Sequence, residues 1–181
     1  MKRSLTAKKI KATKLAFIIS EIILTALVVY RFRPPSRILE VVDDTSRFGA
    51  ERALVVAVIK CESGFNEYAS SAKGARGLMQ LTDKTFDYIV DYNGLGFDSV
   101  FDPYENVAAG RAYLDYLFAR FDGLDEVLCA YNAGEGRTRS WLDDTLYSDD
   151  GRKIKSIPFK ETAKYVKKVK TYYYFYKGAG I

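Results

Sequence analysis

A single glutamate follows a run of seven apolar residues, at a place where a carboxyl group can act as an acid. The apolar run covers residues 53–59, and Glu62 comes directly before the break Ser63-Gly64. A carboxyl group at the edge of a hydrophobic core loses solvation of its charged form, which raises its pKa. Most glutamates at helix ends are solvated surface charges. The role of Glu62 therefore depends on what the rest of the chain places around it.

Three further patches combine small residues with polar side chains that can contact a ligand. The first covers residues 71–80 and ends on Gly-Leu-Met-Gln. The second covers residues 130–136 and reads Ala-Tyr-Asn-Ala-Gly-Glu-Gly, and the third covers residues 157–166. Each patch alone is a weak signal. Their common order behind Glu62 makes them a candidate site.

The composition excludes several kinds of chemistry. The chain of 181 residues has no histidine, which removes Ser-His-Asp and Cys-His nucleophilic systems and every histidine-based metal site. Its two cysteines, Cys61 and Cys129, are too few for a zinc cage or a disulfide framework. We therefore expect no metal and no cofactor.

The net charge of +5 is distributed unevenly. Residues 1–37 hold nine basic residues and one acidic residue, which leaves 19 basic and 22 acidic residues in the rest. A nucleic-acid-binding domain carries its basic excess on the folded domain. We therefore expect no nucleic-acid partner.

The N-terminal segment has the pattern of an uncleaved membrane anchor. Residues 1–14 carry six positive charges and no negative charge, and residues 15–30 are apolar except for Ser20, Glu21 and Thr25. Sixteen residues make about 24 Å of helix, and the flanking residues extend this toward the bilayer core of about 30 Å. The charge bias predicts a cytoplasmic N-terminus and an extracytoplasmic domain.

Two other interpretations of this segment stay open. A cleaved signal peptide would need a small-x-small site after the apolar run, which ends instead on Tyr30-Arg31-Phe32. A core helix of the domain would leave the basic N-terminus unexplained. The predicted organisation is a basic cytoplasmic tail over residues 1–14, a transmembrane signal anchor over 15–32, a linker over 33–37 and a catalytic domain over 38–181.

The remaining pattern predicts a mostly α-helical domain. The run before Glu62 is compatible with a strand or a helix, and the length from Ala50 to Cys61 favours a buried helix. Thr82 is a plausible N-cap, and Asp102-Pro103 begins a long helix because proline fits the first helical turn. Residues 143–156 are polar and predict a loop or hairpin. The expected helices run from 36 to about 49, from 50 to 61, from 82 to about 93, from 103 to about 122, from 124 to 132, from 137 to 142 and from 159 to about 176.

Together, Glu62 and the three patches resemble the catalytic domain of soluble-type lytic transglycosylases, which has a goose-lysozyme-like fold. The order and spacing match over about residues 38–176. The resemblance implies cleavage of the β-1,4 bond between N-acetylmuramic acid and N-acetylglucosamine in peptidoglycan, with formation of a 1,6-anhydromuramoyl end. It implies one catalytic carboxylate, Glu62. The substrate-binding residues that it implies are Ser71, Gly77, Met79, Gln80, Tyr131, Asn132, Glu161 and Tyr165.

One carboxylate is sufficient for this reaction. A retaining or inverting glycosidase needs a second carboxylate as nucleophile or base. In the transglycosylase reaction the 6-hydroxyl of the sugar attacks C1, so Glu62 serves first as acid and then as base. The spacing of Asp83, Asp87 and Asp91 places them on one helix face, which favours solvated charges over a second catalytic acid.

Several residues of the site have structural interpretations as well. Ser71 and Gly77 suit a turn, Met79 and Tyr131 suit a core, and Asn132 suits a helix brace. Thr82 stands where some family members have methionine. Cys61 and Cys129 lie on helices that pack together in the family fold, so they form either a disulfide or two buried free thiols.

Two rival functions remain at this stage. The first is a hydrolytic muramidase on the same fold, which would leave reducing ends in place of anhydro ends. The second is a non-catalytic peptidoglycan-binding scaffold protein. The combination of Glu62, Gln80 and Tyr131 argues against the scaffold.

Overall fold

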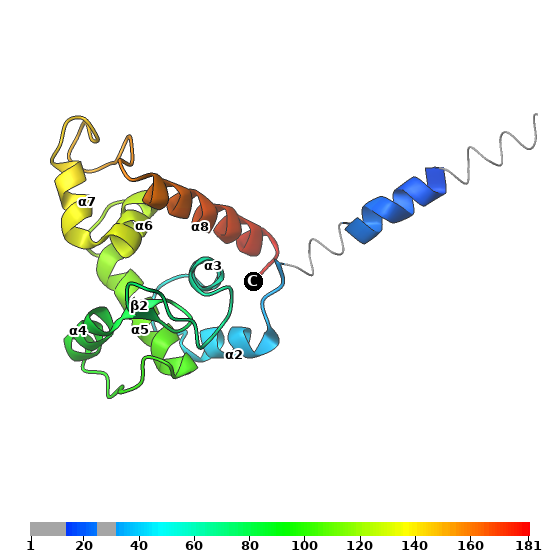
Figure 1. Cartoon of the computed structure of the whole chain (residues 1–181), viewed down its shortest axis with the longest axis horizontal. Coiled ribbons are helices and arrows are strands. Elements are labelled where there is room, and N and C mark those ends of the chain that lie inside the picture. Colours follow the sequence, from blue (N-terminus) through cyan, green and yellow to red (C-terminus); the bar gives the residue numbers. More distant parts are fainter. Residues whose placement is uncertain (1–13, 25–31) are drawn as a thin grey trace, which may run out of the picture. The chain divides into compact units, whose positions relative to one another are not determined.

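Figure 1 shows the computed structural model of the chain, which describes residues 14–24 and 32–181. The chain divides into two compact units, Met1–Pro34 and Pro35–Ile181. In the first unit, residues 14–24 are helical and exposed. The expected anchor is described only in part, because residues 25–31 lie outside the described residues, as do residues 1–13. Within the described ranges, no helix has both the length and the apolar character for a membrane crossing.

The second unit is mostly α-helical, as the sequence predicts. Its short hairpin was not expected, because the two strands have only two residues each and leave no alternating pattern to read. The strands β1 and β2 are antiparallel, with Ala75 opposite Thr82 and Arg76 opposite Leu81. The elements are α2 (Ser36–Asp44), α3 (Arg52–Glu62), β1 (Ala75–Arg76), β2 (Leu81–Thr82), α4 (Asp83–Asn93), α5 (Pro103–Phe118), α6 (Leu124–Ala133), α7 (Glu135–Leu142) and α8 (Lys160–Gly178).

The helix α3 is buried over its whole apolar run. Residues 53–59 are at most 3% exposed, and they belong to one continuous hydrophobic core. A helix that is apolar on every face is stable only when protein surrounds it. Figure 1 shows α3 in the middle of the domain, with α8 on one side and α2 and α5 on the other. The β-branched residues of the run therefore form a helix, and its last residue is Glu62.

Local capping explains where the helices next to the site begin. The Thr82 hydroxyl accepts a hydrogen bond from the Thr85 N–H over 3.2 Å, which confirms Thr82 as N-cap of α4. The Asp102 carboxylate accepts from the Glu105 N–H over 2.9 Å, and Pro103 follows at the first position of α5. The first N–H groups of a helix have no acceptor within the helix, and these two side chains supply one.

Two helices end earlier than the sequence pattern predicts. In α2, the buried Thr45 donates its hydroxyl to the Val42 carbonyl over 2.9 Å, and the chain continues in turns. Side-chain bonds of this kind compete with the helix. In α5, the N–H groups of Arg120 and Phe121 both bond to the Leu117 carbonyl, so a tight turn replaces the expected last helical turn.

Residues 143–156 form a loop with a single antiparallel bridge, between Ser148 and Ile154. The loop is fastened to α6, because the Ile154 N–H donates to the carboxylate of the buried Glu126 over 2.8 Å.

Candidate active site

The side chain of Glu62 lines a cleft of about 530 Å³. The cleft lies between the loop of residues 71–75, the hairpin with the start of α4, the α6–α7 junction and the start of α8. Its walls are mainly polar and aromatic, which suits a ligand rich in hydroxyl groups. The other lining residues with side-chain hydrogen-bonding groups or aromatic rings are Ser71, Lys73, Gln80, Thr82, Thr85, Tyr113, Tyr131, Asn132, Arg137, Phe159, Glu161 and Thr162.

Burial raises the pKa of Glu62 from 4.5 to about 7. The Tyr165 hydroxyl and the positive charge of Lys168 act in the opposite direction and are weaker than burial. The carboxyl group therefore titrates near neutral pH, which allows this side chain to give and to accept a proton.

Two tyrosines lie close to the Glu62 carboxyl. Burial raises the pKa of Tyr131 and Tyr165, and the charge of Glu62 adds to the effect on both. Within the described chain the buried Tyr165 hydroxyl has no hydrogen-bond partner of standard geometry, although it is near enough to lower the Glu62 pKa. Tyr165 thus lies behind the carboxyl, outside the residues that line the cleft.

Gln80 enters the cleft in a strained backbone conformation. Its φ of 49° is in the left-handed region, which is uncommon for a residue other than glycine. Its amide nitrogen donates to the carbonyl groups of Ala69 and Gly77, each over 3.0 Å. The amide oxygen is then the group that Gln80 can offer to a ligand.

Asn106, on α5, holds the loop before Gln80 and was not among the predicted site residues. It is fully buried and accepts a hydrogen bond from the Met79 N–H over 2.8 Å. Its amide group donates to the carbonyls of Arg76, over 3.1 Å, and Val100, over 2.8 Å. Asn106 stands directly before the apolar run Val107-Ala108-Ala109, a pattern that does not by itself distinguish a buried amide from an exposed one.

Gly77 and Met79 do not line the cleft, in contrast to the expected substrate contacts. Gly77 has a φ of +75°, and a Cβ there would lie 2.4 Å from Asn106 Nδ2 and 2.7 Å from the Val100 carbonyl oxygen. Met79 is 0% exposed. Its sulfur packs against Gly110 so closely that a Cβ added there would overlap it. Both residues face the core because Asn106 binds the loop from that side.

Ser71 and Asn132 line the cleft and also brace it. The Ser71 hydroxyl accepts from the Ala75 N–H over 3.0 Å, which closes the turn before β1. The side-chain oxygen Oδ1 of Asn132 accepts from the Thr162 hydroxyl over 2.9 Å, which joins α6 to α8. The Ser71 hydroxyl proton and the Asn132 amide N–H groups are the donors that these residues can offer to a ligand.

Glu161 also lines the cleft and is exposed. It forms an ion pair of 3.5 Å with Lys73, which connects the start of α8 to the loop of residues 71–75. Asp83, Asp87 and Asp91 are exposed and are absent from the lining, as expected for a solvated face. Among the described acidic residues, the lining contains Glu62 and Glu161.

Phe159 and Arg137 line the cleft and were not predicted as site residues. Phe159 is 43% exposed, its ring lies 5.2 Å from that of Trp141, and the Arg137 guanidinium lies 4.9 Å from its centroid. Phe159 belongs to the third patch after Glu62, but it was expected only to begin a helix. An exposed aromatic face is a surface for the apolar face of a sugar ring.

The cysteines are free thiols, so the disulfide alternative is not realised. Burial raises the pKa of both Cys61 and Cys129 to about 12. Such thiols are poor nucleophiles and pack as small apolar groups. Across residues 14–24 and 32–181 there is no cluster of three or more His, Cys, Asp or Glu side chains that could hold a metal ion.

Residues 42–153 match the family model of the Transglycosylase SLT domain, and the chain belongs to this family. The chain is 36% identical over 135 residues to the soluble lytic murein transglycosylase of Salmonella typhimurium, which covers 70% of this chain and 20% of that protein. It is 37% identical over 116 residues to the membrane-bound lytic murein transglycosylase F of Desulfosudis oleivorans, which covers 60% of this chain and 23% of that protein.

Solved structures confirm the lysozyme-like fold that the sequence predicts. An inactive Glu-to-Gln mutant of the lytic transglycosylase Slt from Pseudomonas aeruginosa has a TM-score of 0.66 and 32% identity, over 78% of this chain and 23% of that one. The 70 kDa soluble lytic transglycosylase of Escherichia coli has a TM-score of 0.65 and 30% identity, over 77% and 24%. The chain thus spans about a fifth to a quarter of the length of these relatives.

Proposed function

We propose that the protein is a peptidoglycan lytic transglycosylase. It cleaves the β-1,4 bond between N-acetylmuramic acid and N-acetylglucosamine and leaves a 1,6-anhydromuramoyl end. The observation that carries this proposal is Glu62, a buried carboxyl in a polar cleft with its pKa raised to about 7. The family and the lytic murein transglycosylases among its relatives support the reaction type.

In the proposed reaction, the protonated Glu62 donates its proton to the glycosidic oxygen. The bond between that oxygen and C1 of the muramic acid breaks, and positive charge develops at C1. The 6-hydroxyl of the same sugar attacks C1, and the Glu62 carboxylate takes the hydroxyl proton. The enzyme returns to its starting state without water as a reactant. The attacking hydroxyl is part of the substrate, which gives it a high effective concentration.

The surrounding polar groups are proposed to bind the sugars. The Gln80 oxygen accepts a hydrogen bond from the substrate, while the Ser71 hydroxyl and the Asn132 amide donate hydrogen bonds. Their other hydrogen-bonding atoms are already paired with the protein, which orients these groups before the substrate arrives. Gly77, Met79 and Asn106 position the Gln80 loop, and Tyr165 positions the carboxyl from behind.

The hydrolytic alternative differs in the second step. A hydrolase of the retaining or inverting type would need a second carboxylate besides Glu62, as nucleophile or as base. The other described carboxyl group of the lining, that of Glu161, is exposed and paired with Lys73. This arrangement favours a contact with substrate at the mouth of the cleft over general-base catalysis.

Product analysis tests the proposed reaction. The full chain is incubated with purified sacculi, and the released muropeptides are identified by mass spectrometry. We expect 1,6-anhydro ends from the wild type and a loss of at least about a hundredfold in rate for Glu62→Gln. Reducing ends would establish the muramidase. An active Glu62→Gln variant would exclude the mechanism, and a wild type that binds sacculi without cleaving them would establish the scaffold.

We also propose the organisation expected from the sequence: a cytoplasmic tail over residues 1–14, an anchor over 15–32, a linker over 33–37 and an extracytoplasmic domain over 38–181. In the described helix, Leu15, Phe17, Ile22 and other apolar side chains are between 47% and 65% exposed, which is unfavourable in water. Some relatives are membrane-bound lytic murein transglycosylases.

Membrane fractionation tests the anchor. The full chain is expected to stay in the membrane pellet after alkaline carbonate washing, and external protease is expected to digest the domain in spheroplasts. A variant with Ile18→Lys and Ile22→Lys is expected to lose the pellet association. Release of the wild type by carbonate would exclude a spanning anchor.

A further inference from the structure

A row of aromatic rings leads out of the cleft along α5 and α4. Tyr131 and Tyr113 line the cleft, with ring centroids 5.3 Å apart. Tyr113 lies 6.1 Å from Tyr116, which contacts Tyr88 at 5.7 Å and Tyr92 at 5.4 Å. The rings therefore form one continuous path from the cleft to the surface, and the proposed chemistry at Glu62 does not use its outer part.

The geometry of α4 places the outer rings directly beyond the cleft. Thr82 and Thr85, at the beginning of α4, line the cleft. Tyr88 and Tyr92 follow Thr85 by three and seven residues, which puts them on the same helix face, one and two turns of about 5.4 Å further on. They are 48% and 58% exposed, and their rings are nearly parallel, at 26° and 6.0 Å.

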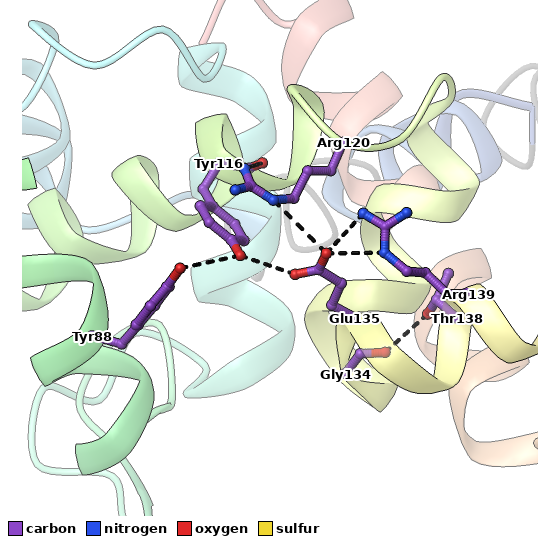
Figure 2. A network of polar contacts seen from close by, with 7 residues as sticks. All are labelled: Tyr88, Tyr116, Arg120, Gly134, Glu135, Thr138 and Arg139. Atoms are coloured by element: carbon purple, nitrogen blue, oxygen red, sulfur yellow. Dashed lines mark hydrogen bonds and ion pairs between the residues drawn. The ribbon is translucent and has the colours of Figure 1, made fainter. Parts of the chain in front are cut away.

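A network of polar contacts supports the rings from behind. Figure 2 shows that the Tyr88 hydroxyl donates to that of Tyr116, over 3.4 Å, and that Tyr116 donates to Glu135, over 3.0 Å. Arg139 gives Glu135 two further hydrogen bonds, of 3.0 and 2.8 Å. The Arg120 guanidinium lies 3.4 Å from the centroid of the Tyr116 ring. The Glu135 carboxylate also forms an ion pair of 3.8 Å with Arg120, so it joins both arginines to the Tyr116 hydroxyl and holds the rings in place.

We propose that Tyr88 and Tyr92 form a platform for sugar residues of the glycan strand that lie beyond the cleft. This inference rests on the proposed function, because the occupant is the same β-1,4-linked strand. The sugars of that strand present C–H faces that pack on aromatic rings, and N-acetylglucosamine carries no charge. Two nearly parallel rings, continuous with the cleft, suit consecutive units of a polymer. The network through Glu135 holds the rings in place before the strand binds, which lowers the entropy lost on binding.

Affinity as a function of glycan length tests the platform. The full chain with Glu62→Gln is titrated by calorimetry with peptidoglycan-derived glycan oligomers, from disaccharide to octasaccharide. We expect the affinity to rise with length until the oligomer reaches the platform. In the Tyr88→Ala, Tyr92→Ala double variant the octasaccharide loses about tenfold in affinity, and the disaccharide serves as the internal reference.

Two control variants accompany the experiment. Tyr88→Phe with Tyr92→Phe keeps both rings and should keep the length effect. Tyr174→Ala removes a tyrosine that is 60% exposed on α8, outside the cleft lining, and should change nothing. Circular dichroism confirms that each variant is folded.

The remaining outcomes separate the two proposals. If the double variant loses affinity equally for oligomers of every length, or loses none, the platform proposal is wrong and the proposed function stands. If the Glu62→Gln chain binds no oligomer and the wild-type chain cleaves no sacculi, both proposals are wrong. A change in sedimentation of the double variant without a change in glycan affinity would show that the tyrosines contact a second copy of the chain, which also overturns the platform.

Discussion

The hydroxyl group of Tyr131 donates a hydrogen bond of 2.7 Å to the carbonyl oxygen of Met79. This bond joins α6 to the loop that carries Gln80. Tyr131 is thus connected to Gln80 through Met79, and all three are predicted site residues. The ring of Tyr131 still lines the cleft. The hydroxyl of this predicted substrate-binding residue thus holds the cleft wall together.

Replacement of Tyr131 by phenylalanine is expected to destabilise the protein. The ring remains, but the buried Met79 carbonyl loses a donor, which costs about 2 kcal/mol of unfolding free energy. Urea unfolding measures this change. Tyr113→Phe is the control, because the hydrogen bonds of the described residues do not include the Tyr113 hydroxyl, and its change should stay within about 0.5 kcal/mol. Equal effects of the two variants would contradict a structural role for the Tyr131 bond.

The rate of cleavage is expected to fall as the pH rises above about 7. Glu62 must be protonated to act as the acid, and burial raises its pKa to about 7. The profile of kcat/KM against pH, with soluble glycan as substrate, measures this pKa in the free enzyme. Tyr165→Phe should move the alkaline limb to higher pH, because the Tyr165 hydroxyl lowers the Glu62 pKa. An alkaline limb below about pH 5 would contradict the assignment.

The same carboxyl predicts how stability depends on pH. Because folding raises the Glu62 pKa from 4.5 to about 7, the folded state loses stability as the pH rises through this window. The loss amounts to about 3 kcal/mol at most. Glu62→Gln removes this loss of stability. The variant should therefore be more stable than the wild type at about pH 8 and about equally stable at about pH 4. Thermal unfolding of both proteins at both pH values measures the difference in their stability. A difference that does not change with pH would contradict the raised pKa.

Two glycine substitutions separate backbone strain from steric overlap. Gly77 and Gly74 have similar φ angles, of +75° and +79°, but only at Gly77 does an added Cβ meet other atoms. Gly74→Ala should cost about 1 kcal/mol from the left-handed backbone alone. Gly77→Ala should cost at least about 3 kcal/mol, because the Asn106 hydrogen bonds are displaced as well. Similar unfolding free energies for both variants would show that the loop adapts without loss.

The ion pair between Lys73 and Glu161 is expected to matter for substrate and little for stability. Both side chains are exposed, so Glu161→Gln should change the unfolding free energy by less than about 0.5 kcal/mol. If Glu161 contacts substrate, KM rises. Glu40→Gln, an exposed glutamate of α2 outside the cleft lining, is the control and should leave KM unchanged. Equal KM values for both variants would exclude Glu161 from substrate binding.

Local patterns in the sequence were sufficient to predict most helices of the domain. The caps at Thr82 and Asp102 and the apolar run before Glu62 act over a few residues, and their signals are visible without a structure. The hairpin of β1 and β2 and the buried Asn106 were missed. Their hydrogen bonds connect residues that the sequence pattern gives no reason to pair, such as Asn106 with Met79.

The sequence by itself predicted that Glu62 follows a buried helix, and the order of the patches indicated the family. Only the tertiary structure decided which residues of each patch face the cleft. Gln80 enters it, while Gly77 and Met79 of the same patch turn inward, because Asn106 on α5 binds the Arg76 carbonyl and the Met79 N–H. The physical reason is that a buried polar backbone must find its partners in distant parts of the chain, and those partners set the direction of each neighbouring side chain.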